Sequence, residues 1–467
     1  MKNLNQLKRL GACVALLLPA STFCRSALAE TTLVEKDGWR FSFDGRVNAF
    51  LSVGKGDDFP TPTPNPATPG TNHAVMGSNK PPGVPDVGWK SAEAGDANNK
   101  YFAMRVRSGM IGNVLGFGLS RDITPTTSVR GYLSLWSTIE TLGRDKWSAI
   151  LPESREGYFS ITGPWGSATV GRQLGWFGRM STEIDYQYGH PYGAGLPCTD
   201  EIGPSCGHIG TGVAFPGYSA GFTYSTPVMG GLQINAGVYD PIIFEPEWQR
   251  APLLRPEGAI TYEVKLGGGG LLKLGAEGLY QPLKRIEEKT DPNTGAMVKS
   301  DASTSVWGGA GGARLELGPL RLGAAFFKGR GVGMAYALQK TSASLNATTK
   351  ELRTFTGVYG QLALVFGKLQ VAAGGGVASA NQLPQDRADV ANSMIKRQIG
   401  VSAAAYYHVS DSVVLGLDYF RFMARWYGAA PSVLDPATNM PVLTAGPLLP
   451  GEKQDLNFIN AGVTYHW

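Results

Sequence analysis

Two stretches at opposite ends of the chain alternate strictly between apolar and polar residues. From Trp39 to Val53 the odd positions are apolar or glycine and most even positions are polar, and the alternation returns from Ile459 to Trp467. A period of two places every second side chain on one face of a β-strand. No apolar run reaches the ~18 residues that indicate a membrane-spanning helix. The chain is therefore predicted to consist of strands with one apolar and one polar face.

Composition supports an all-β chain. The 467 residues include 63 glycines, and 10% are aromatic but only 17% charged; glycine costs about 1 kcal/mol per helical position relative to alanine. The alternation recurs about sixteen times, with a slip near Gly109. The connections between successive segments alternate between short turns and long loops. Lys284–Ser305 is predicted to be one of the long loops.

The polar parity is too charged to be a protein core, as the series Thr261, Glu263, Lys265 illustrates. A β structure can cross a bilayer only as a closed barrel, because lipid offers no hydrogen bonds to free strand edges. An even number of strands, with short turns at the periplasmic rim and long loops at the extracellular rim, is typical of such barrels. The sequence thus predicts a transmembrane antiparallel β-barrel of about 16 strands.

The first 29 residues have the pattern of a secretory signal peptide. Basic residues precede the apolar run Leu10–Ala20, and small residues at Ala27 and Ala29 suit cleavage before Glu30. Residues 30–467 are predicted to form a single barrel domain. The leader carries four of the 42 basic residues and no acidic one, against 37 acidic residues in the chain. The mature protein is therefore nearly neutral, and no nucleic-acid partner is expected.

One connection, within Gly171–Pro216, is far longer than the ~4–6 residues of most loops. It is rich in glycine, proline and aromatic residues, and we expect it to fold inward and set the bore of the pore. It also contains Cys198 and Cys206, which favour a disulfide in an oxidising compartment. A metal site with His190 and His208, or two free thiols, are the alternatives.

Four segments resemble the trimeric general porins of Gram-negative bacteria. FDGRVNAFLSVGKG resembles the first strand of that family, and RVRSGMIG the second. SREGYFSITGPWGSATVGRQ resembles the fourth and fifth strands leading into the inward loop, and AGVTYHW the closing strand. The resemblance implies a water-filled barrel, a homotrimer, and a third loop, residues 174–216, that constricts the lumen.

In that family, basic wall residues face acidic residues of the third loop. The resemblance places the wall at Arg46, Arg107 and Arg172, and Arg172 points inward only if Gly171 forms a bulge. Arg105 and Arg130 are also predicted to belong to the wall, and the candidate loop acids are Glu183, Asp185, Asp200 and Glu201. A C-terminal signal for the barrel-assembly machinery is predicted at Val463, Tyr465 and Trp467.

The function predicted from these features is passive diffusion of small hydrophilic solutes and ions through an outer-membrane porin. A weak anion preference is expected, because basic residues outnumber acidic ones on the lumen parity. The bases are Arg40, Arg46, Arg105, Arg107, Arg130, Lys265, Lys273, Arg314 and Arg321, and the acids are Asp44, Glu140, Glu263, Glu277 and Glu316.

Two alternatives stay open. One is a substrate-specific porin for a sugar or a phosphate-type anion; the other is a barrel without a channel, serving as an adhesin or hydrolase. No Ser/His/Asp or paired-carboxylate pattern is evident, and the glycine-rich runs lack a phosphate-binding context. We therefore expect no enzyme activity, cofactor or metal. The expected partners are small solutes, ions and outer-membrane lipid.

Overall fold

The computed structural model describes most of the chain from residue 31 onward. The described residues are 31–57, 100–139, 153–190, 192–197, 205–244, 248, 250–290, 293, 295–334, 345–346, 349–388, 395–428, 432–434, 441–443 and 453–467. The predicted signal peptide lies outside them. No helix in the described part of the chain is long and apolar enough to cross a membrane.

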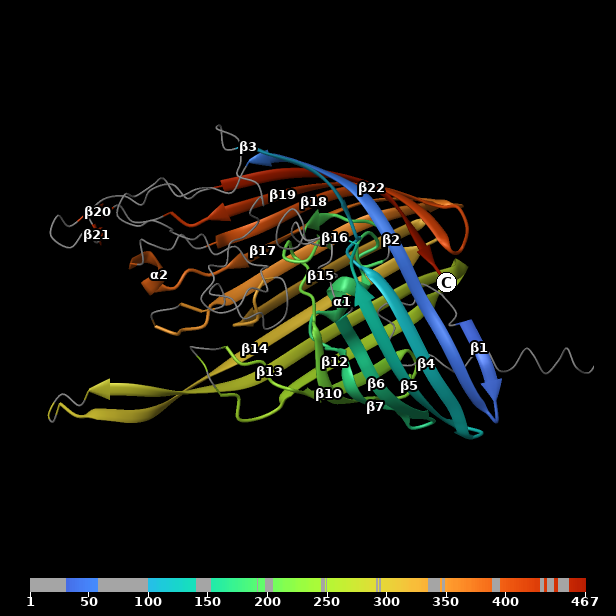
Figure 1. Ribbon diagram of the computed structural model, residues 1–467, viewed down its shortest axis with the longest axis horizontal. Helices are drawn as coiled ribbons and strands as arrows, with labels where there is room; N and C mark the ends of the chain where they lie inside the picture. Colours follow the sequence, from blue (N-terminus) through green and yellow to red (C-terminus); the bar gives the residue numbers. More distant parts are fainter. Residues whose placement is uncertain are drawn as a thin grey trace, which may run out of the picture.

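The strands form a closed antiparallel barrel of 16 strands, as the alternation predicts (Figure 1). β3 and β4 count as one of the 16, because both pair with the same edge of β2. The strands are β2 Trp39–Asp57, β3 Lys100–Arg107, β4 Asn113–Thr124, β5 Thr127–Ser137, β6 Glu153–Gly163, β7 Gly166–Leu174, β10 Tyr218–Ser225, β11 Leu232–Tyr239, β12 Arg255–Leu266, β13 Gly270–Thr290, β14 Met297–Leu317, β15 Leu320–Arg330, β16 Thr354–Phe366, β17 Leu369–Ala380, β18 Ile395–His408, β19 Val413–Trp426 and β22 Lys453–His466. The shorter elements are β1 Thr31–Lys36, β8 Leu196–Pro197, β9 Ser205–Gly207, β20 Ser432–Leu434, β21 Pro441–Leu443, α1 Arg179–Glu183, α2 Pro384–Ala388 and a 3-10 turn at Gly267–Gly269.

The slip predicted near Gly109 is confirmed as the break between β3 and β4. Asn48 of β2 bridges the break with its side chain: Oδ1 accepts from Gly109 N at 2.6 Å, and Nδ2 donates to Ile111 O at 2.8 Å. The Asn48 backbone N–H donates to Asn113 Oδ1 at 2.8 Å. One buried amide therefore satisfies backbone groups that the ladder leaves unpaired.

The barrel closes where β22 pairs with β2, from Arg46 opposite His466 to Gly56 opposite Leu456. β1 turns back at Asp37 and Gly38, both with positive φ as a tight two-residue hairpin requires. It then pairs with β2 beyond the end of β22, so the two strands share one edge of β2.

The apolar parity faces outward, toward lipid. In β2, Val47 and Leu51 are 49% and 45% exposed, whereas Asn48 and Ser52 are each 2% exposed. The predicted C-terminal signal residues Val463 and Tyr465 share this outward face. The polar parity therefore lines the interior, as predicted for a water-filled barrel.

The two faces exchange character near the loop end, the rim at which the long connections lie. Along β19, the outward residue Leu417 is followed on the same face by Arg421, whereas the inward Asp418 is followed by Phe422 and Trp426. Phe422 and Trp426 join a buried apolar cluster at this end. The strands thus continue above the bilayer, where their outer face meets water and their inner face packs against protein.

The prediction that Lys284–Ser305 forms one long loop is wrong, because most of this segment continues the two neighbouring strands. β13 and β14 are each 21 residues long and stay paired to Thr290 opposite Met297, so they project past the rim as a two-stranded ribbon (Figure 1). Beyond the bilayer neither face of a strand has to be apolar. The alternation that marks the other strands is therefore absent from this ribbon.

Candidate functional site

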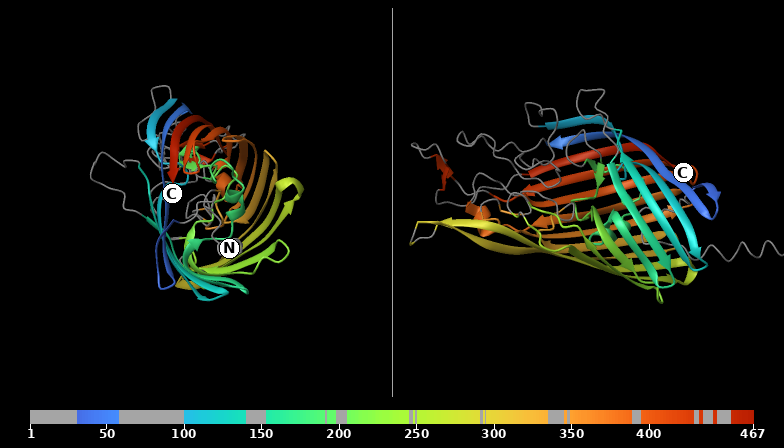
Figure 2. Two further views of the ribbon diagram at one scale, coloured as in Figure 1. Left: turned by 90° about the vertical axis from the view of Figure 1, so that its right-hand side faces the viewer. Right: turned by 60° about the horizontal axis from the view of Figure 1, so that its bottom comes forward.

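The described residues of the segment between β7 and β10, which are 175–190, 192–197 and 205–217, run along the inner wall of the barrel. The view along the barrel shows α1 enclosed by the ring of strands (Figure 2). Nearly all of its described residues are buried, including Ile184 and Tyr188 at 0% exposure. We call residues 175–217 the inner loop; its path is defined by the wall residues that hold it.

Glu257 of β12 holds the start of the inner loop. Its Oε2 accepts from the backbone N–H groups of Trp176 at 2.7 Å and Phe177 at 3.1 Å. Arg255 donates to Glu257 Oε1 at 2.7 Å, with both side chains at most 2% exposed. The carboxylate is thus fixed by a cation and directed at main-chain donors.

Glu277 of β13 binds the next backbone N–H groups along the inner loop. Its two oxygens accept from Gly178 N at 2.7 Å and Met180 N at 2.6 Å. Glu183 at the end of α1 pairs with Lys273 of the same strand at 2.5 Å. The five-residue α1 is therefore tied to β13 at both of its ends.

The middle of the inner loop carries a buried Asp–His–Ser arrangement. Asp185 Oδ2 lies 2.9 Å from His208 Nδ1, and His208 Nε2 lies 2.7 Å from Ser402 Oγ of β18. Tyr359 of β16 donates to Asp185 Oδ1 at 3.1 Å. These residues lie far apart in the sequence without a motif, which is why sequence reasoning missed the arrangement.

The same order of groups activates serine in hydrolases, but here access is missing. His208 is 0% and Ser402 3% exposed, and Ser402 Oγ also lies 3.3 Å from Gly374 O. We therefore expect a fluorophosphonate probe to leave Ser402 unlabelled in the folded protein, with a denatured sample as the matched background. Mass-spectrometric detection of labelled Ser402 would contradict this.

Asp418 of β19 holds the far part of the inner loop. Its carboxylate accepts from Tyr188 Oη at 3.1 Å, from Ala194 N at 3.1 Å and from Gly195 N at 3.2 Å. Asn460 of β22 donates to it at 2.7 Å. These carboxylates thus hold the described part of the inner loop to the wall between β12 and β22. On the other side, Met110 N, in the break between β3 and β4, donates to Gly193 O at 3.2 Å.

Four predicted wall arginines lie on the inward parity of β2, β3 and β5. Arg46 Nε donates to Gly112 O at 3.0 Å, and its guanidinium lies 5.3 Å from the ring centre of Trp136. Arg107 is 1% exposed and Arg105 is half-buried on the same strand. The Arg130 guanidinium lies 4.8 Å from the Tyr132 ring.

Comparison with known proteins identifies the family to which this barrel belongs. A family model described as Gram-negative porin matches residues 12–425. The chain belongs to the Gram-negative porin family. A search of the curated proteins found no match.

Two solved structures show the same fold. The outer membrane channel DcaP of Acinetobacter baumannii is 13% identical, with 94% of this chain and 100% of that chain covered and a TM-score of 0.58. An anion-selective porin from Comamonas acidovorans is 13% identical, with 92% and 100% covered and a TM-score of 0.52. The shared barrel fold agrees with the family match, which places this porin in the outer membrane.

The fifth predicted wall residue of the porin, Arg172, lies apart from the other four. The β6–β7 register runs through Gly171 without a shift, although Gly171 has φ +129°. Arg172 donates to Arg155 O at 3.2 Å, lies 3.5 Å from Glu153, and its side chain is 46% exposed. The pairing thus shows no bulge that turns Arg172 toward Arg46.

The candidate loop acids are directed at the opposite side of the lumen. Glu183 pairs with Lys273 and Asp185 with His208, while Asp200 and Glu201 lie outside the described residues.

The acids found among the wall arginines come from strands instead. Asp44 accepts from Tyr132 Oη at 3.1 Å, and Glu156 accepts from Ser134 Oγ at 3.2 Å and interacts electrostatically with Arg46. Glu156 stands on the inward parity of β6, so the alternation was a signal that could have identified it.

Cys206 is disulfide-bonded, and Cys198, its predicted partner, lies outside the described residues. Among the described residues no group of His, Cys, Asp and Glu side chains is arranged to hold a metal ion.

His190 stands in a row of rings on the inner loop, stacked at 5.9 Å on Tyr186 and 5.6 Å on Tyr192. Burial, together with the nearby Arg314, lowers the pKa of His190 to about 4. The unfolded chain therefore binds a proton that the folded protein does not, between about pH 6.5 and 4. The stability that neutral His190 contributes is present above pH 6.5 and is lost as the pH falls toward 4.

This predicts a measurable difference between the porin and its His190→Gln variant. Melting temperatures followed by circular dichroism should fall more steeply for the wild-type protein than for the variant between pH 6.5 and 4. Parallel curves over that interval would contradict the assignment.

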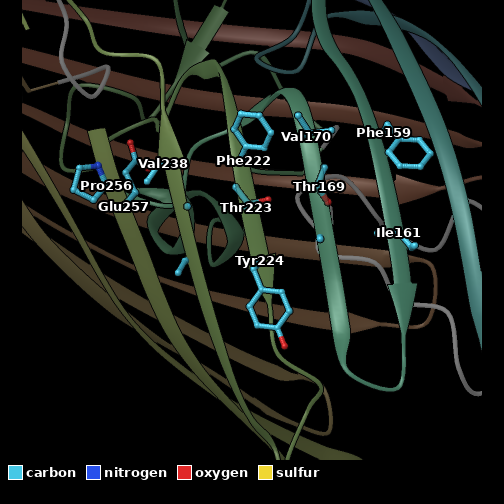
Figure 3. Close-up of a pocket in the computed structure, with 13 residues that line it drawn as sticks. Phe159, Ile161, Thr169, Val170, Phe222, Thr223, Tyr224, Val238, Pro256 and Glu257 are labelled. Carbon is cyan, nitrogen blue, oxygen red and sulfur yellow. The ribbon is translucent and has the colours of Figure 1, made fainter. Parts of the chain in front are cut away.

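A hollow on the outside of the barrel does not belong to the solute path. Outward residues of neighbouring strands line it, among them Phe159, Val170, Phe222 and Tyr224 (Figure 3). Phe222 is 64% exposed on the lipid face, so the hollow opens toward the bilayer.

Proposed function

We propose that this porin admits small hydrophilic solutes and ions by passive diffusion, with a weak preference for anions. The observation that carries the proposal is the division of lumen charges. The carboxylates Glu257, Glu277 and Asp418 accept hydrogen bonds from the inner loop. The arginines Arg46, Arg105, Arg107 and Arg130 stand on the inward parity of β2, β3 and β5, away from those three carboxylates.

Fixed charges select ions by their field in a narrow passage, where the effective dielectric constant is below that of water. Asp44 and Glu156 reduce the positive field without removing it, which supports a weak rather than a strict preference. No catalytic step is part of this proposal.

The test is the reversal potential of the purified porin in a planar bilayer under a KCl gradient. A potential displaced toward the chloride equilibrium value supports the proposal, and one displaced toward the potassium value overturns the anion preference. Absence of conductance would overturn the channel function itself and revive an adhesin or hydrolase.

A substrate-specific channel is the second candidate, favoured by the ring series on the inner loop. Arg314 and Arg321 lie 5.0 Å and 5.8 Å from the ring centre of Tyr186. Rings and guanidinium groups together suit a sugar or a phosphate-type anion. Conductance that saturates or is blocked by such a solute would support this candidate over the general porin.

We also propose that residues 1–29 are cleaved as a signal peptide, that Cys198 pairs with Cys206, and that the porin is a homotrimer inserted by the barrel-assembly machinery. Mass spectrometry of the purified protein, before and after heat dissociation and reduction, gives the mature N-terminus, the number of thiols and the number of subunits.

A further inference from the structure

Trp136 of β5 is a fixed indole ring on the inner face of the barrel wall. The ring is 7% exposed and shares its parity with Ser134 at 0%, whereas Leu133 on the other parity is 44% exposed. Trp136 Nε1 donates to Ser134 Oγ at 2.9 Å. A buried indole N–H that has its partner holds the ring in one orientation.

Two guanidinium groups lie over this ring. That of Arg46, from β2, lies 5.3 Å from the ring centre, and that of Arg155, from β6, lies 4.7 Å from it. A cation within about 6 Å of an indole centre is attracted by the negative face of the ring. Because the ring carries no net charge, it stabilises both cations without neutralising them.

Arg155 reaches the ring because of a bulge in β6. The alternation alone places Arg155 on the outward parity of that strand. Ser134 of β5 stands opposite Glu156, but the next residue, Leu135, stands opposite Ser154, so the pairing skips Arg155. A bulge redirects the side chain of the extra residue. Arg155 is therefore turned toward the inward ring of Trp136.

Two carboxylates lie beside these arginines. Glu156 accepts from Ser134 Oγ at 3.2 Å and interacts electrostatically with Arg46. Glu153 lies 3.0 Å from Arg155 Nε, but its side chain is 54% exposed, and so exposed an ion pair contributes little stability. Without the ring, these carboxylates would be the main attraction left to the two cations, and the positive field of the lumen would weaken.

The same ring meets the end of the inner loop. The Trp136 ring lies 6.0 Å from that of Tyr218, which directly follows the inner loop, and Tyr218 lies 6.0 Å from Phe215 within it. The ring that carries the two guanidinium groups is thus packed against the segment that narrows the lumen.

We propose that Trp136 is a positioning residue of the solute path, which holds Arg46 and Arg155 toward the lumen and so maintains its positive field. The inference rests on the anion preference proposed above and names a residue that sustains it. Trp136 acts through the two guanidinium groups and needs no contact with the solute.

The test compares Trp136→Phe with Trp136→Leu in planar bilayers under a KCl gradient. Both variants lose the Nε1 hydrogen bond, but only phenylalanine retains a ring face. We expect Trp136→Leu to lower the anion-to-cation permeability ratio about two- to fivefold, and Trp136→Phe to stay close to the wild type. Equal ratios in the two variants would overturn the proposal.

Trp165→Leu is the matched control. Trp165 lies at the turn between β6 and β7, is 43% exposed, and stacks on Tyr224 at 6.3 Å. Its replacement removes an indole away from the two arginines and should leave the permeability ratio unchanged. A fall as large as that of Trp136→Leu would overturn the assignment to Trp136.

A double-mutant cycle separates the charges from the width of the passage. In the Arg46→Gln/Arg155→Gln background, Trp136→Leu should change the permeability ratio no further, because the cations through which the ring acts are gone. An undiminished effect in that background would overturn the proposal. The cycle compares ratios with one another, so it decides on Trp136 even for a wild type that prefers cations, a result that would overturn only the proposed anion preference.

Arg155→Gln alone keeps the proposal testable if Trp136→Leu does not fold. The Arg155 side chain is 32% exposed, so its replacement disturbs the packing little. We expect the permeability ratio to fall about twofold from the loss of one lumen cation. An unchanged ratio would show that Arg155 does not face the solute path and would overturn the proposal.

Discussion

Replacing Arg46, Arg105, Arg107 and Arg130 together by glutamine should reduce the anion-to-cation permeability ratio roughly three- to tenfold and reverse the sign of the selectivity. The four guanidinium groups provide the positive field of the wall formed by β2, β3 and β5. With them removed, Asp44 becomes a dominant fixed charge beside the passage.

The measurement is the reversal potential under a KCl gradient, repeated at low and high salt. High salt should shrink the difference between wild type and variant, since the Debye length falls from about 10 Å at 0.1 M to about 3 Å at 1 M.

The control for this prediction is Arg121→Gln, an arginine of β4 on the outward face beside Trp39, 5.4 Å from the ring centre. It removes a positive charge without touching the lumen and should leave the selectivity unchanged. Because Arg46 and Arg107 are buried, the double variant Arg105→Gln/Arg130→Gln provides a milder test that spares them. An unaltered reversal potential in both variants would place the selecting charges elsewhere.

The fold was predictable because a bilayer imposes a simple rule on strands. Inside the membrane the outer face must be apolar, so the period of two reveals each strand and its orientation. The rule ends at the loop-end boundary, and so does the prediction: Arg421 and Phe422 reverse the polarity of β19, and the ribbon Lys284–Ser305 loses the pattern altogether.

The candidate site was predictable only in part, for a different reason. Parity places Arg46, Arg105, Arg107 and Arg130 inside the barrel without further information. The path of the inner loop depends instead on pairings between distant residues. His208 meets Ser402 across 194 positions, and no local pattern in the sequence encodes such a contact.

The loop acids could not be assigned for the same reason. No sequence motif around Glu183 or Asp185 indicates which wall they face. In the structure, Glu183 anchors the inner loop to Lys273 of β13, and Asp185 pairs with His208. An acidic residue on an inward loop can thus hold the loop rather than face the basic wall. The charge count of the lumen then differs from the charge seen by a solute.

The substitution Asp418→Ala should release the far part of the inner loop. It removes the acceptor for Tyr188 Oη and for the backbone N–H groups of Ala194 and Gly195. A buried donor left without a partner costs about 1–3 kcal/mol. We expect the loss of several such bonds to outweigh the two that remain on this stretch, Met110 N to Gly193 O and Asn460 Nδ2 to Gly195 O. The β19–β22 ladder is unaffected, because Asp418 pairs with Asn460 through its backbone as well.

We expect amide hydrogen exchange within residues 185–197 to accelerate at least about tenfold, and single-channel records to gain open-state noise. The melting temperature of the barrel should change little, since its strand pairing is intact. Asp455→Ala on the outer face of β22 is the matched control and should show neither effect. Unchanged exchange in Asp418→Ala would mean that Gln370, which donates to Tyr186 O at 3.0 Å, and the His208 network suffice to hold the loop.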